Sequence, residues 1–150
     1  MHTYTSRSWA SLITAAALAM AAVTGISACS SSSPAASSSE AATGAHLSAT
    51  DFSTAMKAPG TVVLDVRTPA EFAAGHLPGA KNIDIEGPDF ASAIAALDKK
   101  GTYAVYCRSG NRSATAMEQM TAASFTHVYD LAGGIGAWQS MGGPMTMGNP

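Results

Sequence analysis

A lone cysteine at the end of a short apolar run places the strongest constraint on how this chain can fold. The run Ala104-Val105-Tyr106 leads into Cys107, and five polar or small residues follow before a helix-favouring segment begins. Short apolar runs of this kind are typical of a strand buried in a sheet. The pattern therefore predicts a strand, a tight polar loop and a helix, with a thiol on the first residue of the loop.

The loop after Cys107 has the composition that stabilises a thiolate. A tight polar loop can turn its backbone N–H groups inward, and a helix that begins near Arg112 adds the positive end of its dipole. The cysteine is followed by two arginines and three small or polar residues: Arg108, Ser109, Gly110, Asn111 and Arg112. A thiolate is the nucleophilic form of cysteine, whereas a buried structural cysteine normally has apolar neighbours. We therefore expect Cys107 to be a nucleophile rather than a packing residue.

Length and charge exclude several classes of protein. The chain has 150 residues, of which 12% are charged, and a formal net charge of −2. This length is enough for one domain with a core, and the charge offers no basic surface for nucleic acid. Two cysteines, Cys29 and Cys107, are too few for a framework of disulfides. No group of Cys, His and Asp residues has the spacing of metal ligands, so we expect neither a metal nor another cofactor.

The first residues have the pattern of a targeting segment. Arg7 supplies a positive charge, and an alanine-rich apolar stretch at 12–23 is shorter than the roughly 20 apolar residues of a membrane-spanning helix. The sequence Ile-Ser-Ala-Cys at 26–29 resembles the bacterial lipobox. This resemblance implies that residues 1–28 are a lipoprotein signal peptide, that Cys29 is lipidated, and that the mature protein is extracytoplasmic and lipid-anchored to the bacterial cell membrane. An ordinary cleaved signal peptide and an uncleaved anchor are the alternatives.

The segment between the lipobox and the globular domain is rich in serine and alanine. Residues 29–45 cannot bury enough apolar surface to offset the entropy of ordering, so we expect a flexible tether. Such a tether would hold a domain a short distance from a membrane. Glycosylation of the serines is the alternative.

From residue 46 onward, apolar runs of strand length alternate with helical periodicity. The continuous β-branched run at 61–66 is typical of a strand buried on both faces of a parallel sheet. Thr68 is a suitable N-cap for a helix at 69–74, with Pro69 at the first helical position and Glu71 completing a capping box. Further strands are expected at 46–47, 81–85, 103–106 and 127–129, and further helices at 49–57, 88–97, 112–123 and after 133. This alternation predicts an α/β domain over 46–142 with a mainly parallel sheet, followed by a loose tail at 143–150.

Several chemically useful residues follow the ends of predicted strands. Asp65 and Arg67 end one strand, Cys107 follows another, and a Gly-Gly pair at 133–134 follows the last. Ligands of parallel sheets bind beyond the carboxyl ends of the strands, so we expect these residues to meet at one edge. Asp65 is expected to orient the loop or to pair with an arginine rather than to transfer a proton. Arg67 is either that partner or part of the pocket rim.

Three ordered motifs resemble the rhodanese-like sulfurtransferase family over residues 46–142. The first is Leu-Asp-Val-Arg at 64–67, followed by Glu-Phe at 71–72 and Gly-His-Leu-Pro-Gly-Ala at 75–80. The second is the loop at 107–112, and the third is Gly-Gly-Ile-Gly-Ala-Trp at 133–138. The resemblance implies a five-stranded, mainly parallel sheet flanked by helices on both faces.

The same resemblance implies a sulfur-transfer reaction through Cys107. The thiolate would take a sulfane sulfur from a small anionic donor such as thiosulfate, form a persulfide, and pass the sulfur to a thiophilic acceptor, either cyanide or a thiol. Inward N–H groups of the loop would stabilise both anions. Arg108 and Arg112 would hold the donor and stabilise the departing sulfite. The expected state of the protein is a monomer.

Two other functions are compatible with a cysteine loop. Phosphatases and arsenate reductases hold a tetrahedral oxyanion in a longer loop, whereas here four residues separate Cys107 from Arg112. The second alternative is a non-enzymatic persulfide carrier or binding module for a partner protein of the cell envelope. A dithiol redox cycle is disfavoured, because a lipidated Cys29 would leave no second thiol to resolve a disulfide.

Overall fold

The computed structural model describes residues 42–148. Within that part of the chain, no helix is long and apolar enough to cross a bilayer. The signal peptide at 1–28, the lipidated Cys29 and most of the tether lie outside the described residues. These features therefore stay predictions.

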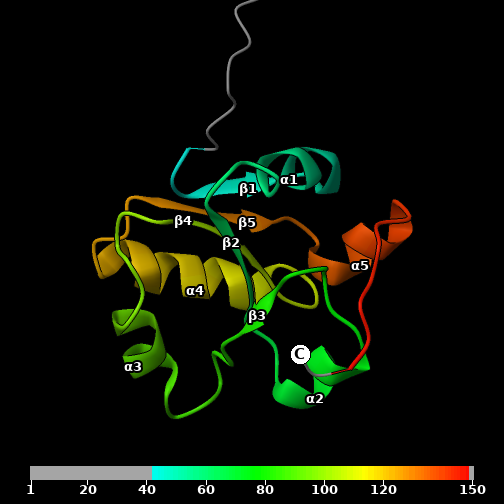
Figure 1. Cartoon of the computed structure of the whole chain (residues 1–150). Helices are drawn as coiled ribbons and strands as arrows, with labels where there is room; N and C mark the ends of the chain where they lie inside the picture. Colours follow the sequence, from blue (N-terminus) through cyan, green and yellow to red (C-terminus); the bar gives the residue numbers. More distant parts are fainter. Residues whose placement is uncertain (1–41, 149–150) are drawn as a thin grey trace, which may run out of the picture. The chain divides into compact units, whose positions relative to one another are not determined.

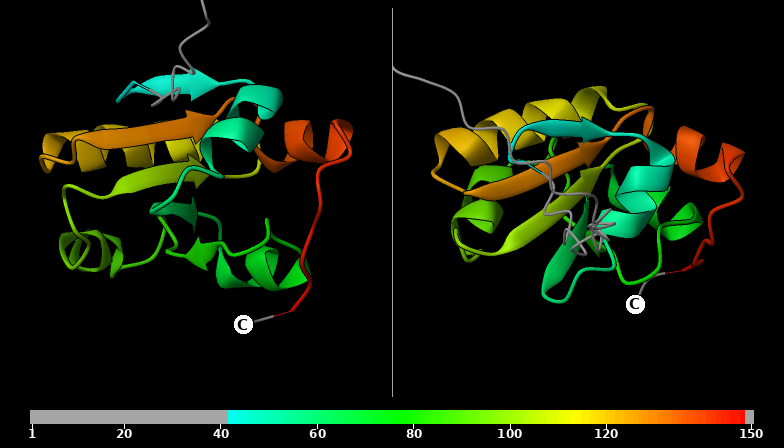
Figure 2. Two further views of the ribbon diagram at one scale, coloured as in Figure 1. Left: turned by 45° about the horizontal axis from the view of Figure 1, so that its top comes forward. Right: turned by 90° about the horizontal axis from the view of Figure 1, so that it is seen from above.

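A five-stranded parallel sheet forms the centre of the fold (Figures 1 and 2). Its strands are β1 (Ala45–Leu47), β2 (Thr61–Asp65), β3 (Lys81–Asn82), β4 (Thr102–Tyr106) and β5 (His127–Leu131). In space they follow the order β1-β5-β4-β2-β3, so β4, which ends just before Cys107, is the middle strand. The predicted α/β fold with a parallel sheet is confirmed.

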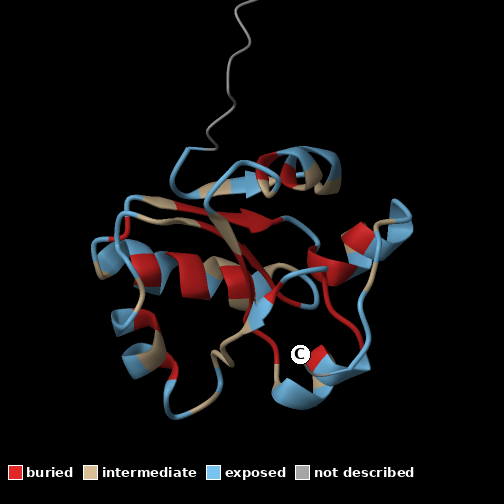
Figure 3. Cartoon of the chain, in the orientation of Figure 1, coloured by how far each residue is buried: buried red, intermediate tan, exposed pale blue. Residues whose placement is uncertain are grey.

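Helices cover both faces of this sheet. The helices α1 (Ala49–Ala55), α2 (Pro69–Ala74) and α5 (Gly134–Ser140) contribute to the core on one face, and α3 (Phe90–Ala95) and α4 (Asn111–Ala122) to the core on the other. Because side chains alternate along a strand, Ala104 and Tyr106 of β4 belong to the first core, whereas Tyr103, Val105 and Cys107 belong to the second. Figure 3 shows the burial of the strands and of one side of α4.

The start of α2 follows the sequence pattern closely. The hydroxyl oxygen of Thr68 accepts a hydrogen bond from the backbone N–H of Glu71 at 3.3 Å, and a carboxylate oxygen of Glu71 accepts one from the backbone N–H of Thr68 at 3.3 Å. Pro69 occupies the first helical turn, where a missing N–H costs nothing. The predicted capping box is confirmed, and it holds Glu71 in a defined orientation.

Two predicted elements are much shorter in the structure, and the helix expected at 49–57 ends two residues earlier, at Ala55. The strand expected at 81–85 is reduced to the two residues of β3, because the chain turns at Asp84, whose carboxylate accepts a hydrogen bond from the backbone N–H of Glu86 at 2.9 Å. The helix expected at 88–97 is reduced to α3, whose N-cap residue, Asp89, makes no capping hydrogen bond with its side chain. Both shortened elements lie away from the middle of the sheet.

The segment after α5 differs from the expectation of a loose tail. Thr146 forms an antiparallel bridge with His76, in which their backbone N–H and C=O groups bond at 2.8 and 2.9 Å. The indole N–H of Trp138 donates to the backbone oxygen of Pro144 at 2.9 Å. Residues 143–148 are therefore packed against the domain. Their partners are tertiary contacts, which no local sequence pattern reveals.

Candidate active site

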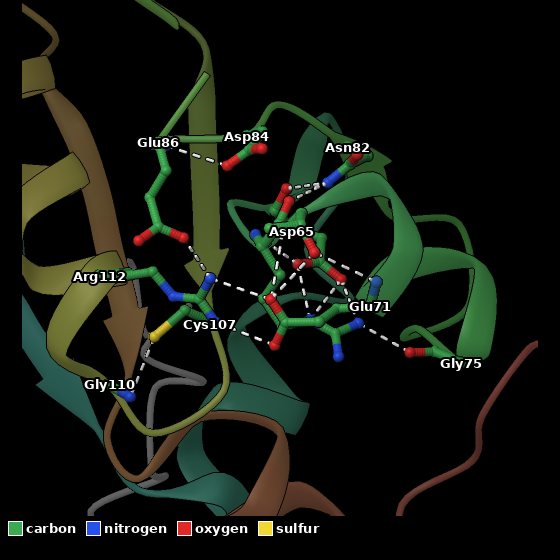
Figure 4. Close-up of polar contacts among 11 residues, drawn as sticks. Asp65, Glu71, Gly75, Asn82, Asp84, Glu86, Cys107, Gly110 and Arg112 are labelled. Atoms are coloured by element: carbon green, nitrogen blue, oxygen red, sulfur yellow. Dashed lines mark hydrogen bonds and ion pairs between the residues drawn. The ribbon is translucent and has the colours of Figure 1, made fainter.

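Cys107 lies at the start of the loop between β4 and α4. It is a free cysteine with 1% relative exposure. Its Sγ atom accepts a hydrogen bond from the backbone N–H of Gly110 at 3.1 Å (Figure 4). Gly110 is the N-cap of α4 and has a left-handed φ of 100°, a conformation that favours glycine. The described contacts thus supply one inward N–H donor to the sulfur, from the N-cap residue of α4.

The predicted meeting of the Cys107 loop with the glycine-rich segment occurs directly through the backbone. The N–H of Ile135 donates to the backbone oxygen of Cys107 at 2.8 Å. A Cβ atom on Gly134 would lie only 2.5 Å from that oxygen and 2.5 Å from the carbonyl carbon of Arg108. The start of α5 and the loop therefore touch at a point where only glycine fits.

Arg112 faces two carboxylates rather than an open site. Its guanidinium donates to both carboxylate oxygens of Glu71, at 2.9 and 3.0 Å, and to Glu86 at 2.9 Å (Figure 4). Hydrogen bonding to Glu71 raises the pKa of Arg112 above its ordinary value. Three of the five N–H groups of this arginine therefore bond to acidic side chains far away in the sequence, and its expected role in holding the donor stays a prediction.

Arg108 is the loop arginine that is available to a ligand. Its side chain is exposed and makes no hydrogen bond or ion pair with any residue of the described range 42–148. Ser109 is also exposed, whereas Asn111 begins α4. The two arginines that were predicted to bind an anion therefore differ. Arg108 has no partner among the described residues, whereas Arg112 is paired with carboxylates.

Asp65 and Arg67 form a buried ion pair. The Nε atom of Arg67 lies 2.9 and 3.0 Å from the two Asp65 carboxylate oxygens, and an NH2 group lies 2.6 Å from one of them. Burial alone would lower the pKa of Arg67, but its hydrogen bonds with Asp65 raise it, and the net shift is upward. The expected pairing of Asp65 with an arginine is thus seen in the structure.

The contacts of Arg67, which follows β2, extend to the turn after α2. Arg67 also donates to the backbone oxygen of Gly75 at 2.7 Å, and its guanidinium lies 5.7 Å from the centre of the Tyr106 ring. Burial and the charge of Asp65 raise the pKa of Tyr106, so the phenol stays neutral. Its oxygen accepts the backbone N–H of Leu77 at 3.0 Å.

A pocket of about 740 Å³ lies beside the loop. Arg67 is part of its wall, so Arg67 is both the partner of Asp65 and a pocket residue. The other lining residues come from α2 and the turn after it, from the Cys107 loop, from α5 and from the C-terminal segment: Glu71, Ala74, Gly75, Arg108, Ser109, Gly133, Ile135, Gly136, Gln139, Met145 and Met147. Among the described residues, no group of three or more His, Cys, Asp or Glu side chains could hold a metal ion.

Sequence patterns identified the loop and the Asp65–Arg67 pair but missed several site residues. Glu71 is recognisable as a capping residue, yet nothing local indicates that it binds an arginine 41 positions later. Glu86 belongs to no sequence motif that would indicate a contact with Arg112. Met145 and Met147 belong to the segment that was expected to be loose.

Replacing Glu71 with glutamine should weaken the domain in a pH-dependent way. Glutamine can keep the capping box but not the ion pair with Arg112. That ion pair lowers the pKa of Glu71, so its stabilisation is present above the ordinary pKa of glutamate and is lost as pH falls through the lowered value. We expect a loss of about 1 kcal/mol at pH 7 that shrinks as pH falls below the ordinary pKa of glutamate and is small at pH 3, measured by urea unfolding.

A matched control for this variant is Glu118→Gln on the exposed side of α4. Glu118 makes no ion pair with the described residues, so its replacement should change stability little at either pH. A loss for Glu71→Gln that is the same at pH 7 and pH 3 would contradict the assigned ion pair.

Comparison with known proteins agrees with the motifs and the fold. Residues 48–141 match the family of the Rhodanese-like domain. Thiosulfate sulfurtransferase GlpE of Pseudomonas entomophila is 36% identical over 86 residues, which are 57% of this chain and 77% of the relative. The matched region is more than half of the chain, and the chain therefore belongs to the rhodanese-like domain family.

Solved structures show the same architecture. The crystal structure of a rhodanese-related protein from Thermoplasma volcanium is 32% identical, with a TM-score of 0.62 over 69% of this chain and 98% of that one. A protein of unknown function from Rhodopseudomonas palustris, described as a possible tyrosine phosphatase, is 28% identical, with a TM-score of 0.55 over 68% of this chain and 84% of that one. The family match and the GlpE relatives support a rhodanese-type sulfurtransferase in general.

Proposed function

We propose that this protein transfers a sulfane sulfur from a small anionic donor such as thiosulfate to a thiophilic acceptor, through a persulfide on Cys107. The observation that carries the proposal is the free Cys107 at the start of the loop that leads into α4, whose sulfur accepts the N–H of Gly110. A donor of this kind stabilises a thiolate and then a persulfide anion, because both place negative charge on sulfur.

The proposed reaction balances with thiosulfate and cyanide. The Cys107 thiolate attacks the outer sulfur of thiosulfate, the S–S bond breaks, and its electron pair leaves with sulfite. The product is a persulfide anion on Cys107. Cyanide then attacks the outer sulfur of the persulfide, which releases thiocyanate and restores the thiolate. The total charge is the same before and after each step.

Arg108 is the residue best placed to bind the anionic donor. Arg67 is neutralised by Asp65, and Arg112 by Glu71 and Glu86. Arg108 lines the pocket next to the loop that carries the cysteine, and within residues 42–148 no acidic side chain pairs with its charge, which is left for an oxyanion. A guanidinium in this position would hold thiosulfate and stabilise the departing sulfite.

The same contacts argue against a phosphatase. A phosphatase loop needs its arginine to bind the phosphoryl oxygens, whereas Arg112 is hydrogen-bonded to two carboxylates. The loop is also short, with four residues between Cys107 and Arg112. A persulfide-carrier module would use the same cysteine, and it differs from the enzyme in needing a partner to load or unload the sulfur.

The proposal is tested by weighing the intact protein after incubation with thiosulfate. We expect one added sulfur, about 32 Da, that disappears on addition of cyanide. The variant Cys107→Ser should gain no mass, whereas Cys29→Ser, the matched control, should be modified like the wild type.

A wild-type mass that stays unchanged with thiosulfate would exclude thiosulfate as the donor. If the mass also stays unchanged with cysteine persulfide and with polysulfide, the sulfurtransferase proposal fails. The binding-module function would then be favoured.

A further inference from the structure

Asp130 is a carboxyl group with no solvent exposure in an otherwise apolar part of β5. Its relative exposure is 0%, and its neighbours Tyr129 and Leu131 are equally buried core residues. Burying a carboxyl group is costly unless the group is hydrogen-bonded. An apolar side chain would fill this position at lower cost, so the contacts of Asp130 should show what the carboxyl group does.

Two side chains contact the carboxyl group from different elements. The Oδ1 atom lies 2.7 Å from Nδ1 of His46, the residue paired with Asp130 in β1. The hydroxyl of Ser113 lies 2.8 Å from Oδ2. Ser113 is in the first turn of α4 and is itself 0% exposed. The carboxyl group therefore ties the edge of the sheet to the beginning of the helix that follows the Cys107 loop.

Ser113 extends these contacts to the sulfur. Its hydroxyl oxygen also lies 2.9 Å from the backbone oxygen of Gly110, and the N–H of Gly110 donates to Sγ of Cys107 at 3.1 Å. Figure 4 shows the Gly110 nitrogen directed at the sulfur. Gly110 has a left-handed φ of 100° and no side chain, so the orientation of its peptide groups depends on the contacts around it.

The hydroxyl of Ser113 has fewer protons than contacts with acceptor oxygens. A hydroxyl has one proton, but Ser113 contacts two oxygen atoms. The hydroxyl can donate this proton to a carboxylate oxygen of Asp130 or to the backbone oxygen of Gly110, one at a time. An amide N–H at residue 130 would instead donate to Ser113, which could then donate to Gly110, so that both contacts are hydrogen bonds together.

We propose that Asp130 is a positioning residue for sulfur transfer, which acts through Ser113 to hold Gly110 with its N–H on the sulfur of Cys107. The proposal rests on the proposed function of Cys107 and assigns a task to two buried polar residues outside the pocket. Neither Asp130 nor Ser113 lines the pocket. Their effect should therefore fall on the rate of sulfur transfer and not on donor binding.

The test measures persulfide formation in a single turnover over a range of thiosulfate concentrations, with rates expressed per folded molecule. Asp130→Ala should lower the saturating rate about tenfold and leave the half-saturating concentration within about twofold, because one oriented hydrogen bond is lost. Ser113→Ala should give the same result. It also keeps the proposal testable if Asp130→Ala fails to fold.

Asp130→Asn is the variant that separates positioning from charge. The amide N–H can donate to Ser113 while the amide oxygen accepts from His46, so all contacts are kept without a negative charge. We expect its rate to stay within about threefold of the wild type. Thr115→Ala is the matched control for Ser113→Ala, because Thr115 is an exposed residue of α4 whose hydroxyl, among the described residues, bonds only to the backbone oxygen of Asn111.

Three results would overturn the proposal. Equal losses for Asp130→Asn and Asp130→Ala would show that charge and not positioning is responsible. Lower stability with wild-type rates for the folded fraction would show a purely structural role. Rate losses of Asp130→Ala and Ser113→Ala that multiply in the double variant would show that the two residues act independently. A wild type that is not loaded by any sulfur donor would instead refute the proposed function and this inference with it.

Discussion

Replacing Asp65 with alanine should destabilise the domain by about 3–5 kcal/mol, because it would leave the Arg67 guanidinium buried without its counter-charge. Asp65 is 0% exposed and Arg67 is 5% exposed. Four hydrogen bonds join them, three from the guanidinium and one from the backbone N–H of Arg67. Urea unfolding at pH 7 measures the loss.

The pair is expected to behave as a unit. Arg67→Met should also be destabilising, since it leaves Asp65 buried without its partner. The double variant Asp65→Ala/Arg67→Met removes both charges, so it should be more stable than the sum of the two single losses by about 1–3 kcal/mol. A loss below about 1 kcal/mol for Asp65→Ala, or strictly additive losses, would contradict a coupled buried ion pair.

The fold was predictable because several local patterns agreed. The continuous β-branched run before Asp65 and the apolar run before Cys107 both indicated buried strands, and these strands pair in the structure as β2 and β4. The capping pattern around Thr68 indicated the start of α2, which the structure confirms. Each of these signals depends on nearest neighbours in the chain, and such signals are present in the sequence itself.

The candidate site was predictable in part for the same reason. Cys107 and its loop form one continuous segment, and Asp65 and Arg67 are two positions apart, so their chemistry could be inferred locally. The partners of Arg112 could not, because Glu71 is 41 and Glu86 is 26 positions away. The contacts of Asp130 with His46 and Ser113 span 84 and 17 positions. Long-range partners of this kind depend on how the strands and helices pack, which no single motif encodes.

Replacing Gly134 with alanine should destabilise the domain by about 3 kcal/mol and disturb the Cys107 loop. Gly134 has a left-handed φ of 58°, which costs a residue with a Cβ atom roughly 1–2 kcal/mol. The added Cβ atom would also lie 2.5 Å from the backbone oxygen of Cys107 and 2.6 Å from the backbone nitrogen of Ser109. Backbone atoms cannot rotate away as a side chain can, so overpacking adds about 1–3 kcal/mol.

The effect of this variant should extend to the reaction, because the atoms that must move belong to the loop that carries the nucleophile. We expect persulfide formation per folded molecule to fall at least about tenfold, as is typical when reacting groups are misplaced. Gly60→Ala is the matched control: Gly60 has a similar φ of 82°, but a Cβ atom there meets nothing within 4 Å. The control should lose only the conformational part, about 1–2 kcal/mol, and keep its activity. If Gly134→Ala is no more harmful than Gly60→Ala in both measurements, the close contact between α5 and the loop does not hold the cysteine in place.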